Sequence, residues 1–182
     1  MISTLNPLCS VSSTSFLVEV MALAKKLVRF NPLILILNYE VKTVKDLEPF
    51  LKDFSTKYDL KVTPLVIIAK GYEGEFYNSI VVNKEQYGAK MCLIEAPNMY
   101  QIEALIDMVA ITGATLITDD AGLKPIHSKV EHLGTCKKII VSRASTLIVD
   151  GAGSKESVEL LKKQIEGEGA SAKDEQVKEV FE

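Results

Sequence analysis

Two adjacent carboxylates, Asp119 and Asp120, are the side chains of this sequence best suited to acid–base chemistry. They follow the apolar run TLIT (115–118), and α/β enzymes place catalytic acids at the carboxyl ends of strands. Adjacent side chains tend to diverge, however, and the letters DDAG are also typical of a turn. We therefore predict a turn here, and keep a small α/β enzyme with an acidic site near these two residues as the alternative.

The two histidines, His127 and His132, are candidate metal ligands. On a helix, five residues of separation turn two side chains about 140° apart, which does not suit a shared metal ion. We expect no metal site, and a role for both histidines at the surface or at a helix end.

Glycines at 71 and 74 follow a strand-like run and precede a helix-like run, as in loops that bind phosphate. The letters GYEGE nevertheless lack both the G-x-G-x-x-G and the Gly-Lys-Ser/Thr patterns, and Glu73 and Glu75 would repel a phosphate. The letters DGAG (150–153) are likewise typical of a turn before a helix. No nucleophile and base can be paired from these residues, so we predict that the chain is not itself an enzyme.

Composition restricts the class of protein further. The chain has 182 residues, 47% of them hydrophobic and 25% charged, with a formal net charge of −3, which indicates one globular domain. This charge predicts binding to neither nucleic acid nor an anionic membrane. The apolar runs are only as long as strands, which is too short to span a membrane. The absence of a basic residue before Lys25 argues against a secretory signal. Three well-separated cysteines, Cys9, Cys92 and Cys136, favour a reducing compartment.

Strand-like and helix-like segments alternate from residue 32 onward. Strands are expected at 32–38, 62–69, 89–95 and 115–118, with helices at 43–58, 72–85 and 101–112 between them. This alternation predicts a parallel sheet with right-handed helical crossovers. A hairpin (137–142 and 146–151) and a charged helix from Ser154 are expected to follow.

Two segments carry more local predictions. Thr43 is a plausible N-cap of the helix at 43–58, with Asp46 three residues on, and Pro49 is expected to bend that helix. The segment 16–30 is ambiguous between a helix and, at its end, a strand.

The helix predicted at 72–85 has two apolar stripes. Phe76 and Ile80 share one face, while Tyr77 and Val81 form a second stripe rotated by about 100°. The second stripe, with Val82 beside it, either packs against residues 1–30 or a neighbouring domain, or is an exposed binding surface.

The order of these segments resembles the apical domain of GroEL-type (group I) chaperonins across nearly the whole chain. The matching segments are NPLILILNYEVKTVKDLEPFL (31–51), VTPLVIIAKGYEGEFYNSIVVN (62–83), IEAP (94–97), ITGATLITDDAGLK (111–124), LGTCKKIIVS (133–142) and TLIVDGAG (146–153). Single pieces are unspecific, whereas their order is specific. The resemblance implies an α/β fold with a central, largely parallel sheet, flanking helices and an additional β-hairpin.

The resemblance also implies a domain division and a set of partners. Residues 1–166 would be a polypeptide-binding apical domain, and 167–182 a linker and partial helix leading to the rest of the subunit. The parent protein would be a homo-oligomeric, cytoplasmic or organellar ring that uses ATP and Mg²⁺, whereas this segment would hold no cofactor. Its partners would be unfolded or partly folded polypeptides and a co-chaperonin.

In the family, clients bind a groove between two helices that match 43–58 and 72–84. The positions that correspond to family binding positions are Phe16, Leu51, Tyr77, Val81, Val82 and Asn83. Glu48 and Lys52 on the groove rim depart from the family pattern, and we expect them to pair along the helix, which makes the rim more polar.

Overall fold

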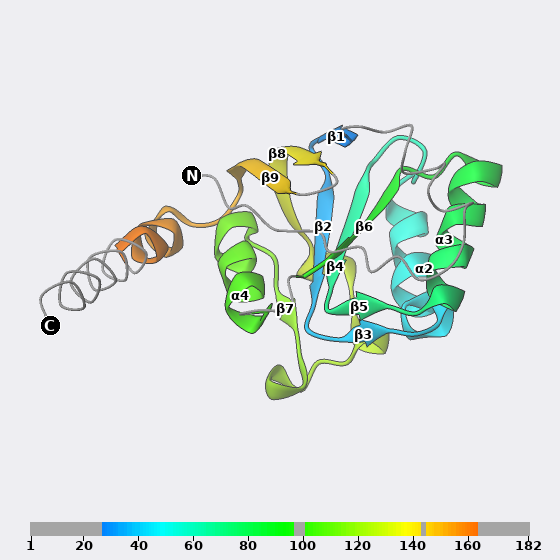
Figure 1. The fold of residues 1–182 in the computed structure, drawn as a ribbon, viewed down its shortest axis with the longest axis horizontal. Coiled ribbons are helices and arrows are strands. Elements are labelled where there is room, and N and C mark those ends of the chain that lie inside the picture. The colour runs from blue at the N-terminus through cyan, green and yellow to red at the C-terminus, as the bar shows by residue number, and fades with distance from the viewer. Residues whose placement is uncertain (1–26, 97–100, 143–144, 164–182) are drawn as a thin grey trace, which may run out of the picture.

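The computed structural model describes residues 27–96, 101–142 and 145–163, which form an α/β fold (Figure 1). Phe16 and the predicted linker at 167–182 lie outside the described residues. The main strands are β1 (Leu27–Phe30), β2 (Leu33–Leu37), β4 (Leu65–Ala69), β6 (Met91–Glu95), β7 (Leu116–Ile117), β8 (Gly134–Val141) and β9 (Thr146–Gly151). The longer helices are α2 (Glu48–Lys57), α3 (Gly74–Tyr87) and α4 (Gln101–Thr112), and residues 155–163 are also helical. Among the described residues, no helix combines the length and apolar character needed to span a bilayer.

Parallel pairing builds one half of the main sheet. β2 pairs with β4, and β4 with β6, so that β6 is the last described strand on this side. β2 and β4 are almost continuously apolar because both of their faces are buried. The helices that join these strands are α2, between β2 and β4, and α3, between β4 and β6.

Antiparallel pairing builds the other half. β8 pairs with the start of β2, and further along with both β1 and β9, while β7 pairs parallel with the end of β2. The expected hairpin is confirmed as β8 and β9. It belongs to the main sheet, which is therefore mixed, while the four strands expected to be parallel (β2, β4, β6 and β7) do pair in parallel.

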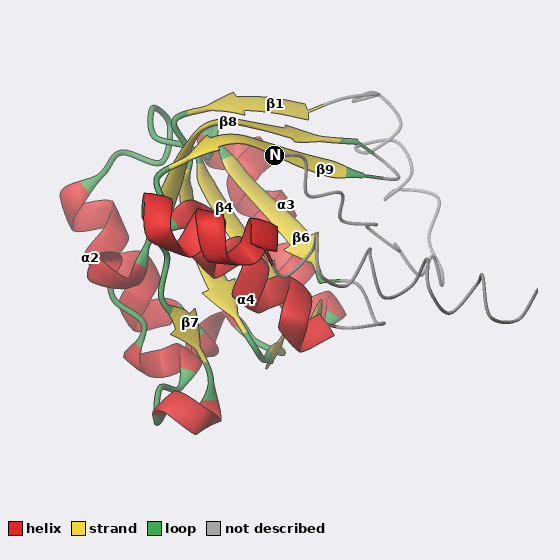
Figure 2. Cartoon of the chain, turned by 90° about the vertical axis from the view of Figure 1, so that its left-hand side faces the viewer, coloured by secondary structure: helices red, strands yellow, loops and turns green. Residues whose placement is uncertain are grey.

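The two faces of the sheet carry separate hydrophobic cores. Side chains alternate between the faces along each strand, so that Leu35 and Ile67 point to one core and Ile34 and Val66 to the other. Phe50, Phe54, Phe76 and Ile80 of α2 and α3 complete the first core. Leu105 and Met108 of α4 complete the second. Figure 2 shows α4 in front of the sheet and α3 behind it.

Short elements fix the start of α2. Residues Val44–Asp46 form a 3-10 turn (η1), and an Asp46 carboxylate oxygen accepts the Thr43 N–H at 2.8 Å. The helix proper begins at Glu48, which places Pro49 in its first turn. The expected continuous helix from 43 is thus interrupted, and Pro49 does not bend a helix interior, because proline fits the first turn without loss of a hydrogen bond.

A second, two-stranded sheet joins the N-terminal ends of α2 and α3. β3 (Glu40–Val41) and β5 (Gly71–Tyr72) pair in parallel. Lys42 and Glu73 extend this connection with an ion pair of 3.1 Å between Nζ and Oε1. The two helices therefore start from a common, hydrogen-bonded base.

The two glycines of the DGAG segment (150–153) allow close packing against α4. Gly153 N–H donates to the Ile111 carbonyl at the end of α4 (2.9 Å). A Cβ atom at Gly153 would overlap the Ala110 carbonyl oxygen, and one at Gly151 would overlap the Ile111 carbonyl oxygen. Glycine at both positions allows the chain after β9 to dock on the end of α4.

Both described cysteines are free thiols. Burial raises the pKa of Cys92 and of Cys136 to about 11, so both thiols remain protonated near neutral pH.

Candidate functional site

The direction in which each helix runs decides where the predicted binding residues point. Because α2 and α3 each connect neighbouring parallel strands, the two helices run parallel to each other on the same face of the sheet. Equivalent positions around two parallel helices point in the same direction. Each residue advances about 100° around a helix, so the buried residues Phe50 and Phe76 serve as common reference points.

Leu51 lies on the flank of α2 that faces α3. It is partly buried and packs against the core beneath the two helices. The opposite flank carries Pro49 and Asp53, and Asp53 Oδ2 accepts the Val130 N–H at 3.4 Å. This hydrogen bond shows that the Asp53 flank faces the segment after β7, which leaves the Leu51 flank for α3.

Tyr77 and Val81 lie on the flank of α3 that points away from α2. Tyr77 comes one residue after the buried Phe76, as Leu51 comes one residue after the buried Phe50. Because the two helices are parallel, Tyr77 points in the same direction from α3 as Leu51 does from α2, which is toward the side of β6. Both side chains are partly buried, yet neither belongs to the set that packs on the core of this face. We call these two residues the outer stripe.

Val82 lies on the flank of α3 that faces α2, with Asn83 beside it. Val82 is 45% exposed, and the exposed Asn83 donates from Nδ2 to the Ser79 carbonyl at 2.8 Å. We call Leu51, Val82 and Asn83 the inter-helix surface. By helix geometry, the predicted site residues among the described ones fall on two surfaces, one between α2 and α3 and one on the outer flank of α3, and their binding role stays a prediction.

The inner contacts of α3 are concentrated in its first half. Phe76 and Ile80 are its buried residues, while Tyr87 near its end is 61% exposed. Gly88 ends the helix in the left-handed conformation (φ 68°), which glycine adopts without strain.

The predicted pair on the rim is confirmed. Lys52 Nζ lies 2.7 Å from Glu48 Oε1 on the solvent-facing side of α2. The hydrogen bond and the charge of Lys52 lower the pKa of Glu48. At the base of α3, the hydrogen bond and charge of Glu73 raise the pKa of Lys42.

Asp119 and Asp120 lie in a 3-10 turn, η2 (Asp119–Ala121), which confirms the predicted turn. Both are exposed, and the turn ends at Gly122 in the left-handed conformation. The nearby Tyr39 hydroxyl donates to the Leu123 carbonyl at 2.8 Å. Desolvation, with a further contribution from Asp119, raises the Tyr39 pKa to about 12, so the phenol is no acid or base near neutral pH. Within the described ranges, no group of three or more His, Cys, Asp or Glu side chains could hold a metal ion.

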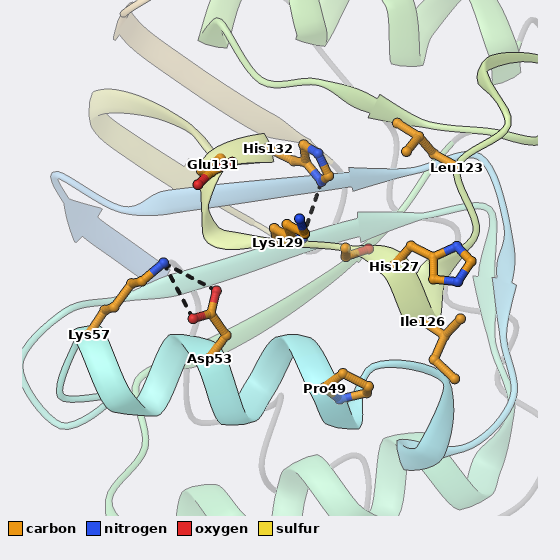
Figure 3. A pocket seen from close by; sticks show the side chains of 10 residues that line it. Pro49, Asp53, Lys57, Leu123, Ile126, His127, Lys129, Glu131 and His132 are labelled. Atoms are coloured by element: carbon orange, nitrogen blue, oxygen red, sulfur yellow. Dashed lines mark hydrogen bonds and ion pairs between the residues drawn. The ribbon is translucent and has the colours of Figure 1, made fainter.

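A hollow between α2 and two 3-10 turns escaped the sequence reasoning. The turns are η3 (Pro125–His127) and η4 (Val130–His132), and each histidine ends one of them. The lining residues are Pro49, Asp53, Lys57, Leu123, Ile126, His127, Ser128, Lys129, Glu131 and His132 (Figure 3). The signal available in the sequence was the run KPIHSKVEH (124–132), which places two lysines and two histidines between strands.

Comparison with known proteins identifies relatives of the chain. No protein-family model matches it. Two curated proteins named Chaperonin GroEL, from Neorickettsia risticii and Neorickettsia sennetsu (strain ATCC VR-367 / Miyayama), are each 38% identical to it over 145 residues. The match covers 78% of this chain and 26% of each relative, so the chain spans about a quarter of the length of these proteins.

Proposed function

We propose, on the basis of its homology to GroEL chaperonins, that this chain is the polypeptide-binding segment of a GroEL-type chaperonin subunit. The identity of 38% over 145 residues carries this proposal. The partly exposed apolar side chains on both flanks of α3 support it, because an unfolded polypeptide offers apolar side chains in no fixed order. The parent protein would be an ATP- and Mg²⁺-dependent cytoplasmic ring, used with or without a co-chaperonin.

The inter-helix surface and the outer stripe would act together on one client. Apolar side chains accept segments of many sequences, since hydrophobic contact is non-directional and does not select one hydrogen-bond pattern. Covering four apolar anchors contributes at most about 1.5–3 kcal/mol each, or roughly 6–12 kcal/mol as an upper bound, because Leu51, Tyr77 and Val81 are already partly buried. The loss of rigid-body freedom and the ordering of side chains cost about 4–15 kcal/mol. A single segment would therefore bind weakly, and several copies in a ring would bind tightly through multivalency.

New carboxylates on α3 test the proposal on each flank separately. Val81→Glu places a charge in the outer stripe, and Val82→Glu places one in the inter-helix surface. Each variant should keep nearly its full thermal stability, within about 0.5–1 kcal/mol, because neither side chain is part of the core. Each should weaken capture of a chemically denatured client by about tenfold or more, since a client must desolvate the carboxylate on binding.

Two controls accompany these variants. Thr56→Glu adds the same charge to an exposed position of α2 on the flank turned away from α3, and capture should be unchanged. Phe76→Ala removes a fully buried ring and should cost about 3–5 kcal/mol of stability. Normal capture by both Val81→Glu and Val82→Glu would refute the proposal, as would unfolding caused by Val81→Glu together with a stable Phe76→Ala variant.

A further inference from the structure

Two short 3-10 turns, η1 and η4, are closed by the same kind of hydrogen bond. In η1, an Asp46 carboxylate oxygen accepts the Thr43 N–H at 2.8 Å. In η4, Nδ1 of His132 accepts the Lys129 N–H at 3.2 Å, which a dashed line in Figure 3 marks. In both turns the third residue reaches back to a backbone N–H that has no partner within the turn itself. The two turns differ in the acceptor, which is a carboxylate in η1 and an imidazole nitrogen in η4.

The two acceptors respond differently to acid. An ordinary aspartate is ionised above a pH of about 3.9, so its carboxylate accepts hydrogen bonds throughout the range near neutrality. An ordinary imidazole gains its second proton near a pH of about 6.5, and both of its nitrogens are then donors. A protonated His132 ring would present an N–H to the Lys129 N–H, and the hydrogen bond that closes η4 could not form.

The ring of His132 is open to protonation while the backbone beside it is held separately. The side chain is partly exposed, so solvent reaches the ring. The His132 carbonyl accepts the Thr115 N–H at 2.9 Å, and the His132 N–H donates to the Lys129 carbonyl at 3.1 Å. Loss of the side-chain hydrogen bond would therefore loosen the start of η4 and leave its end in place.

The start of η4 also contacts α2. The Val130 N–H donates to Asp53 Oδ2 at 3.4 Å. The Val130 side chain is partly buried and packs against the core that α2 completes. Val130 directly follows Lys129, so a change in the backbone of Lys129 also changes the contact between η4 and α2.

The surroundings of the ring contain charges of both signs. The other charged or titratable groups that line the same hollow are Asp53 and Lys57 of α2, His127 of η3, and Lys129 and Glu131 of the segment itself. The two lysines balance the two carboxylates in number when His127 is neutral. The closed turn requires a neutral His132 ring, whereas the open turn also accepts a protonated one. Uptake of a proton therefore favours the open turn, and a fall in pH shifts the equilibrium toward it.

We propose that His132 is a pH-sensitive switch for the turn between β7 and β8. The turn is closed while the His132 ring is neutral and opens when the ring is protonated, and opening weakens the contact of Val130 with Asp53 on α2. The inference rests on the hydrogen bonds of η4 and does not depend on the polypeptide-binding proposal for α3.

Exchange of backbone amide protons with water, measured by NMR on the 182-residue chain at pH 7.5 and pH 5.5, tests the proposal. Each rate is divided by the rate of the same residue in an unfolded peptide at the same pH, which gives a protection factor. The protection factor of Lys129 should be about fivefold lower at pH 5.5, the effect of losing one ordinary hydrogen bond, and that of Val130 should fall with it. Thr43 is the internal control and should keep its protection. Equal protection of Lys129 at both pH values would overturn the proposal, as would a parallel loss at Thr43.

Three variants assign the effect to one side chain. His132→Asp supplies a carboxylate acceptor, as in η1, and should keep the Lys129 amide protected at both pH values. His132→Ala supplies no acceptor and should leave this amide equally unprotected at both. His127→Ala removes the other histidine of the chain and should preserve the pH dependence of the unaltered protein. A pH-dependent Lys129 amide in His132→Asp, or loss of the dependence in His127→Ala, would refute the assignment to His132.

Discussion

At the scale of single residues, the rim of the candidate surface is polar, as expected from the departure of Glu48 and Lys52 from the family pattern. Glu48 and Lys52 stand one helical turn apart and pair at 2.7 Å. Both side chains are largely exposed, so solvent screens their attraction and the pair contributes little to stability. Its main consequence is to fix two charges beside the inter-helix surface.

The pair has a defined dependence on pH. Lys52 lowers the pKa of Glu48 in the folded state, so the pair stabilises the fold above the ordinary glutamate pKa of about 4.3. This stabilisation is lost as the pH falls through the lowered pKa of the folded state. Lys52→Ala should therefore raise the Glu48 pKa toward its ordinary value, as measured by NMR titration of the side-chain carboxyl carbon. The same titration curve in both proteins would show that the pair does not form in solution.

At the scale of elements, most strands and helices followed from the sequence because their apolar patterns are long and regular. The expected helix at 101–112 has the same limits as α4, and the four expected parallel strands contain β2, β4, β6 and β7. Their order in space did not follow, since only tertiary pairing shows that β8 contacts β2, β1 and β9 in turn.

The candidate site was predictable only in part, for a similar reason. Periodicity correctly separates Tyr77 from Phe76 on α3, because it depends on neighbouring residues alone. Periodicity does not show which element lies beside each flank of α3. That information comes from the parallel course of α2 and α3 and from the order of the strands in the sheet. The hollow was missed because its walls come from distant segments, and the 3-10 turns that carry His127 and His132 have no periodicity to detect.

The contact between Gly153 and α4 gives a prediction about stability. Gly153→Ala should lower the free energy of unfolding by about 1–3 kcal/mol, because its Cβ atom would overlap the Ala110 carbonyl oxygen and force the chain after β9 away from α4. Chemical denaturation would measure this loss. Gly74→Ala is the control, since a Cβ atom at Gly74 meets nothing within 4 Å and alanine favours a helix. Equal stability of the two variants would show that the close approach at Gly153 is not maintained in solution.

At the scale of the whole molecule, the chain matches 26% of each GroEL relative. The proposed role is therefore that of one part of a subunit, and the work of an ATP-driven ring would be shared with the other parts.

The division predicts no ATP turnover by the isolated chain. Purified, tag-free protein of 182 residues should hydrolyse ATP no faster than the buffer does, as measured by release of inorganic phosphate with excess Mg²⁺. A contaminating ATPase would separate from the protein during further chromatography. Hydrolysis that follows the purified protein through successive columns would contradict the proposed division.

The uneven anchoring of α3 has a mechanical consequence. Phe76 and Ile80 hold its first half on the sheet, and the base formed with β3 and β5 holds its start, whereas Val82, Asn83 and the exposed Tyr87 lie beyond these supports. The chain is held again directly after the helix, where Ala89 is buried and the Lys90 N–H donates to the Leu60 carbonyl at 2.7 Å. α3 is therefore supported at both ends, and the exposed side chains of its last turns can change rotamer without any movement of the helix itself.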